Sequence, residues 1–304
     1  MIAVEKEVIH LIEQRGPLTG AEIYDALGGD GLALWRACRL SKILSLRTLG
    51  RRYLRLDSRV EGFARLSPSI FREFLTYSVI GLDADPDPLL DKADRLVHHI
   101  EGVSRGKSQL AFNIAASVAN QFESEFPVVE HACFIIAGDI VYNMAHDVPR
   151  PERSTGRLVR GSDMDLVVVV DDLFPATLLN RLDEAIYEEK YRLLITPHIR
   201  EEIDYVVKDM TRVREQLGFE TFKQMVACKI LHEGTLLYGS EELFHHLKTS
   251  LRERGISLKL DAMEKSAQIF RLEAERTLLS EAPGALSGDG SCLFYPIEES
   301  EEFE

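Results

Sequence analysis

CFIIAGDIVYNMAHDVPRPERSTGRLVRGSDMDLVVVVDD, residues 133–172, is the stretch around which this chain is organised. Its apolar run, residues 133–137, ends at Gly138 and opens onto a short segment of helical character. A loop rich in arginine follows, and Asp163-Met164-Asp165 then leads directly into the β-branched run of residues 166–170. A run of this kind is typical of a buried strand. The stretch therefore predicts two buried strands joined by a glycine turn and a long loop.

The two carboxylates before the second strand indicate a chemistry. Side chains alternate along a strand, so Asp163 and Asp165 are expected to project from the same face. Two carboxylates on one face repel each other unless a cation lies between them. Oxygen ligands that leave room for water and phosphate suit Mg²⁺. The spacing favours metal-assisted phosphoryl chemistry over the alternative, a pair of solvated carboxylates at a strand start.

The order of strand, Gly138, short helix, loop and Asp163-x-Asp165 resembles the nucleotidyltransferase superfamily typified by DNA polymerase β. The closer likeness is to the small bacterial nucleotidyltransferase domains. In that family a glycine turn cradles the triphosphate, and two carboxylates with a third from a later strand hold two metal ions. The turn usually reads Gly-Ser or Gly-Gly, whereas here it reads Gly138-Asp139. The resemblance covers roughly residues 125–240.

The third carboxylate of the family pattern is expected from a strand near the first two. Asp204 is the polar residue inside the strand-like run 203–207, where its burial without a cation would be costly. Glu201 and Glu202 directly precede this run and are the competitors. The resemblance thus implies that the catalytic residues and the metal ligands are the same three side chains, Asp163, Asp165 and Asp204. It also implies a nucleotide-binding set of Gly138, Asp139, Ser162 and Lys229.

The implied reaction moves a nucleoside monophosphate from a nucleoside triphosphate, such as ATP, to an acceptor hydroxyl and releases pyrophosphate. Two Mg²⁺ ions are the expected cofactors, with Mn²⁺ as an alternative. The arginines of loop 146–162 have two interpretations: guanidinium groups that match phosphate oxygens, or a solvated insertion. The acceptor is not identified by the sequence.

Composition sets the wider limits. The chain has 304 residues and a formal net charge of −14, a length that predicts two or three domains. No apolar run approaches a membrane span and the N-terminus lacks a basic-then-apolar signal pattern, so we expect no membrane partner. The four cysteines have no paired spacing, which is typical of reduced thiols. A cytoplasmic protein is therefore expected.

The first 60 residues resemble a winged helix-turn-helix domain. Three short helices are expected, then a β-hairpin formed by residues 44–49 and 53–56. Between residues 36 and 59 eight basic side chains stand against one acidic side chain, a local excess that indicates a nucleic-acid footprint. The alternative is a protein-docking module. The expected nucleic-acid contacts are Arg36, Arg39, Arg51, Arg52 and Arg55.

The remaining segments complete the predicted α+β architecture. Residues 61–124 read as a helical connector with a hinge at 83–88, and Gly106-Lys107-Ser108 lacks the spacing and the preceding strand of a phosphate loop. The nucleotidyltransferase domain, a mixed sheet with helices, is assigned to residues 125–250. Residues 251–304 are expected to form a packing or homodimerisation helix, followed by an acidic tail.

Two further hypotheses stay open beside the nucleotidyltransferase with a nucleic-acid-binding winged helix. One is a DNA-binding transcriptional regulator whose transferase domain is inactive and senses nucleotide. The other is a toxin-like nucleotidyltransferase that modifies RNA or protein.

Overall fold

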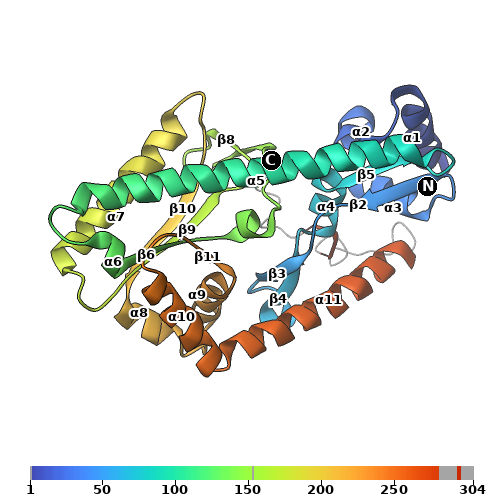
Figure 1. Cartoon of the computed structure of the whole chain (residues 1–304). Coiled ribbons are helices and arrows are strands. Elements are labelled where there is room, and N and C mark those ends of the chain that lie inside the picture. Colours follow the sequence, from blue (N-terminus) through green and yellow to red (C-terminus); the bar gives the residue numbers. More distant parts are fainter. Residues whose placement is uncertain (1, 153, 281–292, 296–304) are drawn as a thin grey trace. The chain divides into compact units, whose positions relative to one another are not determined.

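The structure is a computed structural model that describes residues 2–152, 154–280 and 293–295. The chain forms two compact units (Figure 1). Unit 1 comprises Met1–Arg55, Ala64–Ile100 and Glu264–Glu304, and unit 2 comprises Leu56–Phe63 and Glu101–Met263. Helices and several small sheets coexist, so the predicted α+β class is confirmed. Among the described residues, no helix combines the length and apolar character needed to cross a membrane.

Unit 1 packs helices against a three-stranded sheet of order β1-β5-β2. Its elements are α1 (Ile2–Arg15), β1 (Leu18–Thr19), α2 (Gly20–Leu27), α3 (Gly31–Leu40), β2 (Leu44–Thr48), β3 (Tyr53–Leu56, whose last residue belongs to unit 2), β4 (Ala64–Ser67), α4 (Ile70–Thr76) and β5 (Ser78–Leu82). Thr19 caps α2 with a capping box, and Asp30 caps α3. Each side chain accepts a hydrogen bond from a backbone N–H in the first turn, which stabilises the start of its helix. Trp35, Phe74 and Ile80 lie in the core.

The predicted hairpin of residues 44–49 and 53–56 is wrong. Strand β2 pairs antiparallel with β5, in a register that places Leu46 opposite Ile80, whereas β3 pairs with β4. Val79 and Ile80 point to opposite faces of β5 and both are fully buried, so this strand takes the central position. The prediction of a helical connector over residues 61–124 is therefore wrong at residues 78–82, which form this strand.

Helix α5 (Pro86–Phe122) is one continuous helix of 37 residues. Its first turn covers residues 86–88 of the expected hinge at 83–88, so the turn is limited to the residues before it. Gly102 and Gly106 lie inside α5, and each costs about 1 kcal/mol relative to alanine. Side chains on one face of α5, among them Ser104 and Lys107, stay buried on both sides of the glycines, so packing holds the helix together there. The rejection of a phosphate loop at residues 106–108 is therefore confirmed. Residues 86–100 belong to unit 1 and residues 101–122 to unit 2.

Unit 2 is built on a four-stranded mixed sheet of order β10-β9-β6-β11. Its elements are η1 (Glu61–Phe63), the second part of α5, α6 (Val128–His131), β6 (Ala132–Ala137), η2 (Gly138–Tyr142), β7 (Pro149–Pro151), β8 (Leu158–Arg160), β9 (Met164–Val170), α7 (Ala176–Ile195), β10 (Ile203–Asp209), α8 (Met210–Gln216), α9 (Phe222–Glu233), β11 (Thr235–Gly239), α10 (Glu241–Glu253) and the start of α11 (Ile256–Ser280). Strands β9 and β10 are parallel, and β6 is antiparallel to β9.

The two faces of this sheet have different partners. Phe134, Ile136, Leu166 and Val168 pack with the apolar sides of α5 and α7, which lie on one face (Figure 1). Helices α8, α9 and α10 lie on the other face, toward which the alternate side chains point. Asp165, the acidic residue of β9, belongs to this second face, together with the buried side chains of Cys133, Ile135 and Val167. Both faces of the sheet are therefore packed, and the second face also carries the carboxylate of Asp165.

Three cysteines, Cys38, Cys133 and Cys228, are buried free thiols. Cys292 and the acidic tail, residues 298–304, lie outside the described residues. The helix expected within residues 251–304 is present as α11.

Candidate functional site

The register of two parallel strands brings the expected carboxylates together. Asp204 of β10 lies opposite Asp165 of β9, and Asp163 precedes β9 on the same side of the chain as Asp165. One oxygen from each of the three side chains lies within 4.8 Å of the others. Asp163 and Asp165 are half-buried and Asp204 is exposed, so the cluster opens to solvent on the Asp204 side. The predicted convergence of these three residues is therefore present.

The electrostatics of the cluster are unfavourable without a cation. Burial raises the pKa of Asp165 well above its ordinary value, and the nearby charges of Asp163, Asp204, Asp139 and Glu233 raise it further. A divalent cation would replace this repulsion with attraction. The donor set contains only carboxylate oxygens, which fits Mg²⁺ or Mn²⁺ and does not suit metals that prefer sulfur or imidazole.

The backbone conformation at position 138 and its contact with Asp165 both require a glycine. The φ of Gly138 is +70°, and a Cβ atom at this position would lie 1.9 Å from Oδ2 of Asp165. The backbone at the end of β6 therefore contacts the central carboxylate directly, and any side chain would displace that carboxylate. The glycine turn read from the sequence is thus a close backbone approach to Asp165.

Ser162 and Asp139 link the two ends of the long loop. The Ser162 hydroxyl donates to Oδ2 of Asp139 at 2.7 Å, and the backbone N–H of His146 donates to the Ser162 hydroxyl oxygen at 3.2 Å. Both residues lie next to the carboxylate cluster, since Gly138 precedes Asp139 and Asp163 follows Ser162. Asp139 adds a fourth carboxylate near the cluster, and its charge contributes to the raised pKa of Asp165.

Glu233, at the end of α9, is a site residue that the sequence analysis missed. Lys229 Nζ lies 2.6 Å from its carboxylate, and the Tyr142 hydroxyl donates to Oε2 at 2.7 Å. The backbone N–H of Gly138 donates to Oε1 at 3.4 Å. Glu233 therefore connects α9 to the glycine turn and holds the predicted Lys229 beside it. Its four-residue spacing from Lys229 on a predicted helix was the available signal.

The two competitors of Asp204 are bound by cations of the fold. Lys107 of α5 forms an ion pair with Glu201 and also donates to the backbone oxygen of Arg160 at 2.7 Å. Arg150 of β7 lies 2.9 Å from Glu202. Both glutamates are thus used to attach neighbouring segments to β10. Only Asp204 joins the aspartate cluster.

Residues 149–151 and 158–160 of the arginine-rich loop form a pair of short strands around Arg150. Strands β7 and β8 pair antiparallel, with Arg150 opposite Val159. Arg150 is buried, and its Nε donates to the backbone oxygen of Gly161 at 2.8 Å. Arg157 and Arg160 are exposed, and Arg153 lies outside the described residues. The interpretation of this loop as a solvated insertion is therefore wrong for Arg150.

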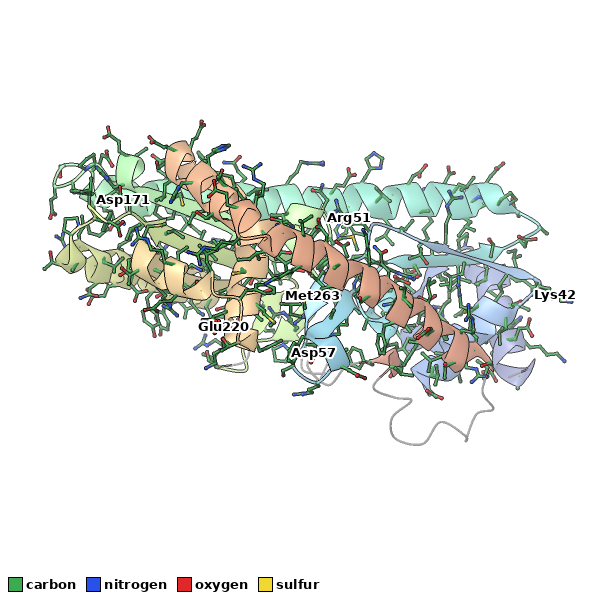
Figure 2. The ribbon with its side chains drawn as sticks, turned by 90° about the horizontal axis from the view of Figure 1, so that it is seen from below. Lys42, Arg51, Asp57, Asp171, Glu220 and Met263 are labelled. Carbon is green, nitrogen blue, oxygen red and sulfur yellow. The ribbon has the colours of Figure 1, made fainter. Side chains whose placement is uncertain are left out.

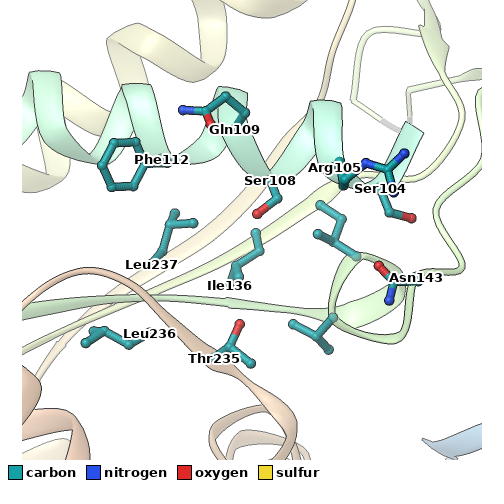
Figure 3. Close-up of a pocket in the computed structure, with 12 residues that line it drawn as sticks. Ser104, Arg105, Ser108, Gln109, Phe112, Ile136, Asn143, Thr235, Leu236 and Leu237 are labelled. Atoms are coloured by element: carbon teal, nitrogen blue, oxygen red, sulfur yellow. The ribbon is translucent and has the colours of Figure 1, made fainter. Parts of the chain in front are cut away.

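A pocket of about 500 Å³ lies on the opposite face of the sheet (Figure 3). Ser108 and Phe112 of α5, Ile136 of β6 and Leu237 of β11 line it. The Ile136 side chain belongs to the face covered by α5, whereas its neighbour Ala137 pairs with Asp165. The pocket and the carboxylate cluster therefore lie on opposite faces of the sheet, and the end of β6 with η2 borders both.

The predicted nucleic-acid contacts of unit 1 divide into two groups. Arg36 is buried, with one guanidinium nitrogen 3.4 Å from the backbone oxygen of Leu279. Arg52 binds Glu73 at 2.6 Å and Glu275 at 2.7 Å. These two arginines serve the packing of the unit. The others are at least partly open to solvent: Arg39 and Arg51 are exposed and Arg55 is half-buried.

The basic side chains of residues 36–59 do not form one continuous patch on the surface of unit 1. Lys42, which follows α3, and Arg51, which precedes β3, lie apart in Figure 2. Basic side chains that are close in sequence thus reach separate parts of unit 1.

The site as a whole consists of three aspartates that converge on a glycine turn, with Glu233 and Lys229 beside that turn. No family model, no curated protein and no solved structure matches this chain.

Proposed function

We propose that unit 2 is a metal-dependent nucleotidyltransferase that transfers a nucleoside monophosphate from a nucleoside triphosphate to an acceptor hydroxyl. The observation that carries the proposal is the convergence of Asp163, Asp165 and Asp204 at the end of two parallel strands, directly against the backbone of Gly138. A strand, a glycine turn and paired aspartates in this order are the features of the polymerase-β-like superfamily. The geometry of the cluster supports the residue assignment made from that order.

Asp163, Asp165 and Asp204 would hold one or two Mg²⁺ or Mn²⁺ ions. When bound, such ions polarise phosphate oxygens and make an acceptor hydroxyl more acidic. Asp204 is the most exposed of the three carboxylates, so it is the one that an acceptor can reach, and its oxygen would accept the hydroxyl proton. Asp165 is the carboxylate whose position is most restricted by burial, and the backbone of Gly138 lies directly against it.

The triphosphate is proposed to lie along the glycine turn. The Lys229 ammonium is held beside this turn by Glu233 and supplies a positive charge there. Asp139 and Ser162 are already hydrogen-bonded to each other, so their part is to shape the turn. The excess of negative charge around Asp165 requires that the triphosphate enter together with its metal ions, because phosphate alone would be repelled.

Unit 1 is proposed to bind nucleic acid through Arg39, Arg51 and Arg55. Two capped helices, α2 and α3, lie beside a small sheet, an arrangement compatible with a helix-turn-helix reader. The acceptor would then be nucleic acid or a protein bound to it. This candidate depends on the accessibility of these arginines, two exposed and one half-buried. The protein is proposed to act in the cytoplasm.

The test supplies each nucleoside triphosphate, labelled at the α-phosphate, with Mg²⁺ and a total cell extract. We expect labelled product from the wild-type protein, and a loss of roughly hundredfold or more for Asp163→Asn and Asp165→Asn, equivalent to about 2.7 kcal/mol of barrier. The matched control is Asp172→Asn, an exposed aspartate beyond the far end of β9 whose partner is Arg214. The control should retain wild-type activity. Equal activity in all variants would exclude these carboxylates from the reaction.

A further inference from the structure

Arg150 is a buried cation that lies between two carboxylates. One is Asp163 of the aspartate cluster, and the other is Glu202, which lies outside the cluster. The Arg150 side chain is 8% exposed, and one terminal nitrogen lies 2.9 Å from Oε2 of Glu202 and 3.8 Å from Oδ2 of Asp163. Its Nε donates to the backbone oxygen of Gly161 at 2.8 Å, which fixes the guanidinium plane. Glu202 is itself 11% exposed and directly precedes β10. The shorter contact is therefore to the carboxylate outside the aspartate cluster.

From this geometry we infer that Arg150 and Glu202 together set the metal affinity of the cluster. Arg150 acts as a resident counter-cation of Asp163, and Glu202 holds it back so that Asp163 stays available to a metal ion. The inference rests on the proposed function, because it assumes that the aspartates bind a divalent cation. Both residues are positioning residues in this role.

The charges explain why the two partners should act in opposite directions. If Glu202 loses its charge, Asp163 is the anionic partner that Arg150 keeps among the described residues, so Arg150 approaches Asp163 and competes with the metal ion. If Arg150 loses its charge, Asp163 loses its competing cation and the uncompensated charge of Glu202 adds to the negative potential. Adding or removing a unit charge about 4 Å from a metal ligand changes the electrostatic attraction of the site for a divalent cation, and the metal affinity should change roughly tenfold.

A merely structural role makes a different prediction. The pair also attaches β7 to the segment before β10, so either single substitution would loosen the loop that leads to Asp163. Loss of that attachment would weaken metal binding in both single variants. The direction of the change therefore separates the two roles.

The experiment titrates the full-length protein with Mn²⁺ alone and follows free Mn²⁺ by electron paramagnetic resonance. We expect Glu202→Gln to weaken binding roughly tenfold and Arg150→Gln to tighten it roughly tenfold. The double variant, Arg150→Gln with Glu202→Gln, removes both charges and should bind within about threefold of wild type. It also guards against misfolding, because it leaves no buried charge without its partner.

Three outcomes overturn the inference. If both single variants weaken binding, the pair is structural. If all variants bind like wild type, Arg150 has no influence on Asp163. If the wild-type protein itself binds no Mn²⁺, the metal site of the proposed function fails and the inference fails with it. The last outcome is distinguishable because it is seen before any substitution is made.

Discussion

Replacing Gly138 with alanine tests the contact between the glycine turn and Asp165. The substitution has two separable costs. At a φ of +70° an alanine costs about 1 kcal/mol more than glycine in the free energy of folding. Its Cβ would also lie 1.9 Å from Oδ2 of Asp165, so the carboxylate or the turn must move by about 1 Å to reach an acceptable contact.

The second cost falls on function, because a misplacement of about 1 Å in a catalytic group can lower the rate by roughly hundredfold. Gly156→Ala is the matched control: its φ is +66°, and a Cβ there meets no atom of the described residues within 4 Å. We expect both variants to lose about 1 kcal/mol or somewhat more in urea unfolding. Only Gly138→Ala should lose transfer activity and Mn²⁺ affinity. Equal activity in the two variants would refute the claim that Gly138 positions Asp165.

Three further outcomes are expected. Burial lowers the pKa of Lys208 to about 8, so its charge destabilises the folded protein below pH 8, and that penalty disappears as the pH rises toward 10.5. Lys208→Met should therefore raise the free energy of unfolding by about 2 kcal/mol at pH 7, a figure that allows for the lost hydrogen bond to Gln216. Urea titrations at the two pH values should show a smaller gain near pH 10. Ser108→Trp fills the pocket under α5 and should leave the affinity for MgATP unchanged by calorimetry; a large loss would move the nucleotide to that pocket. Arg39→Ala with Arg51→Ala should weaken binding to mixed-sequence duplex and reduce its salt slope by about one unit per lost phosphate contact, whereas unchanged binding in mobility-shift titrations would contradict the proposed surface.

The central part of the site was accessible from the sequence because strand geometry is local. Alternation places Asp163 and Asp165 on one face, and the family pattern directs attention to a later strand. The sequence also favoured Asp204 over Glu201 and Glu202, although it predicted a buried Asp204 and the structure shows it exposed. The sequence did not supply the partners of the two glutamates. Lys107 is far away in the sequence, and its pairing with Glu201 cannot be read from local pattern.

The errors have a common physical origin in long-range contacts. The strand at residues 78–82 is central in its sheet because it pairs with β1 and β2, and neither pairing has a local sequence signal. The continuity of α5 past two glycines depends on packing that outweighs their low helix propensity. Arg36 and Arg52 belong to a basic stretch that indicates nucleic-acid binding. In the structure they instead contact Leu279 and Glu275, which come from the other end of the chain.

The most direct test of metal-dependent nucleotidyl transfer follows two labels in paired reactions. ATP, or whichever triphosphate proves active, is labelled either at the α-phosphate or at the γ-phosphate and incubated with Mg²⁺ and the acceptor-containing extract. We expect the product to carry the α-label alone, the γ-label to leave as pyrophosphate, and both signals to be lost in Asp165→Asn. Transfer of the γ-label to product, or undiminished α-label transfer by Asp165→Asn, would contradict it.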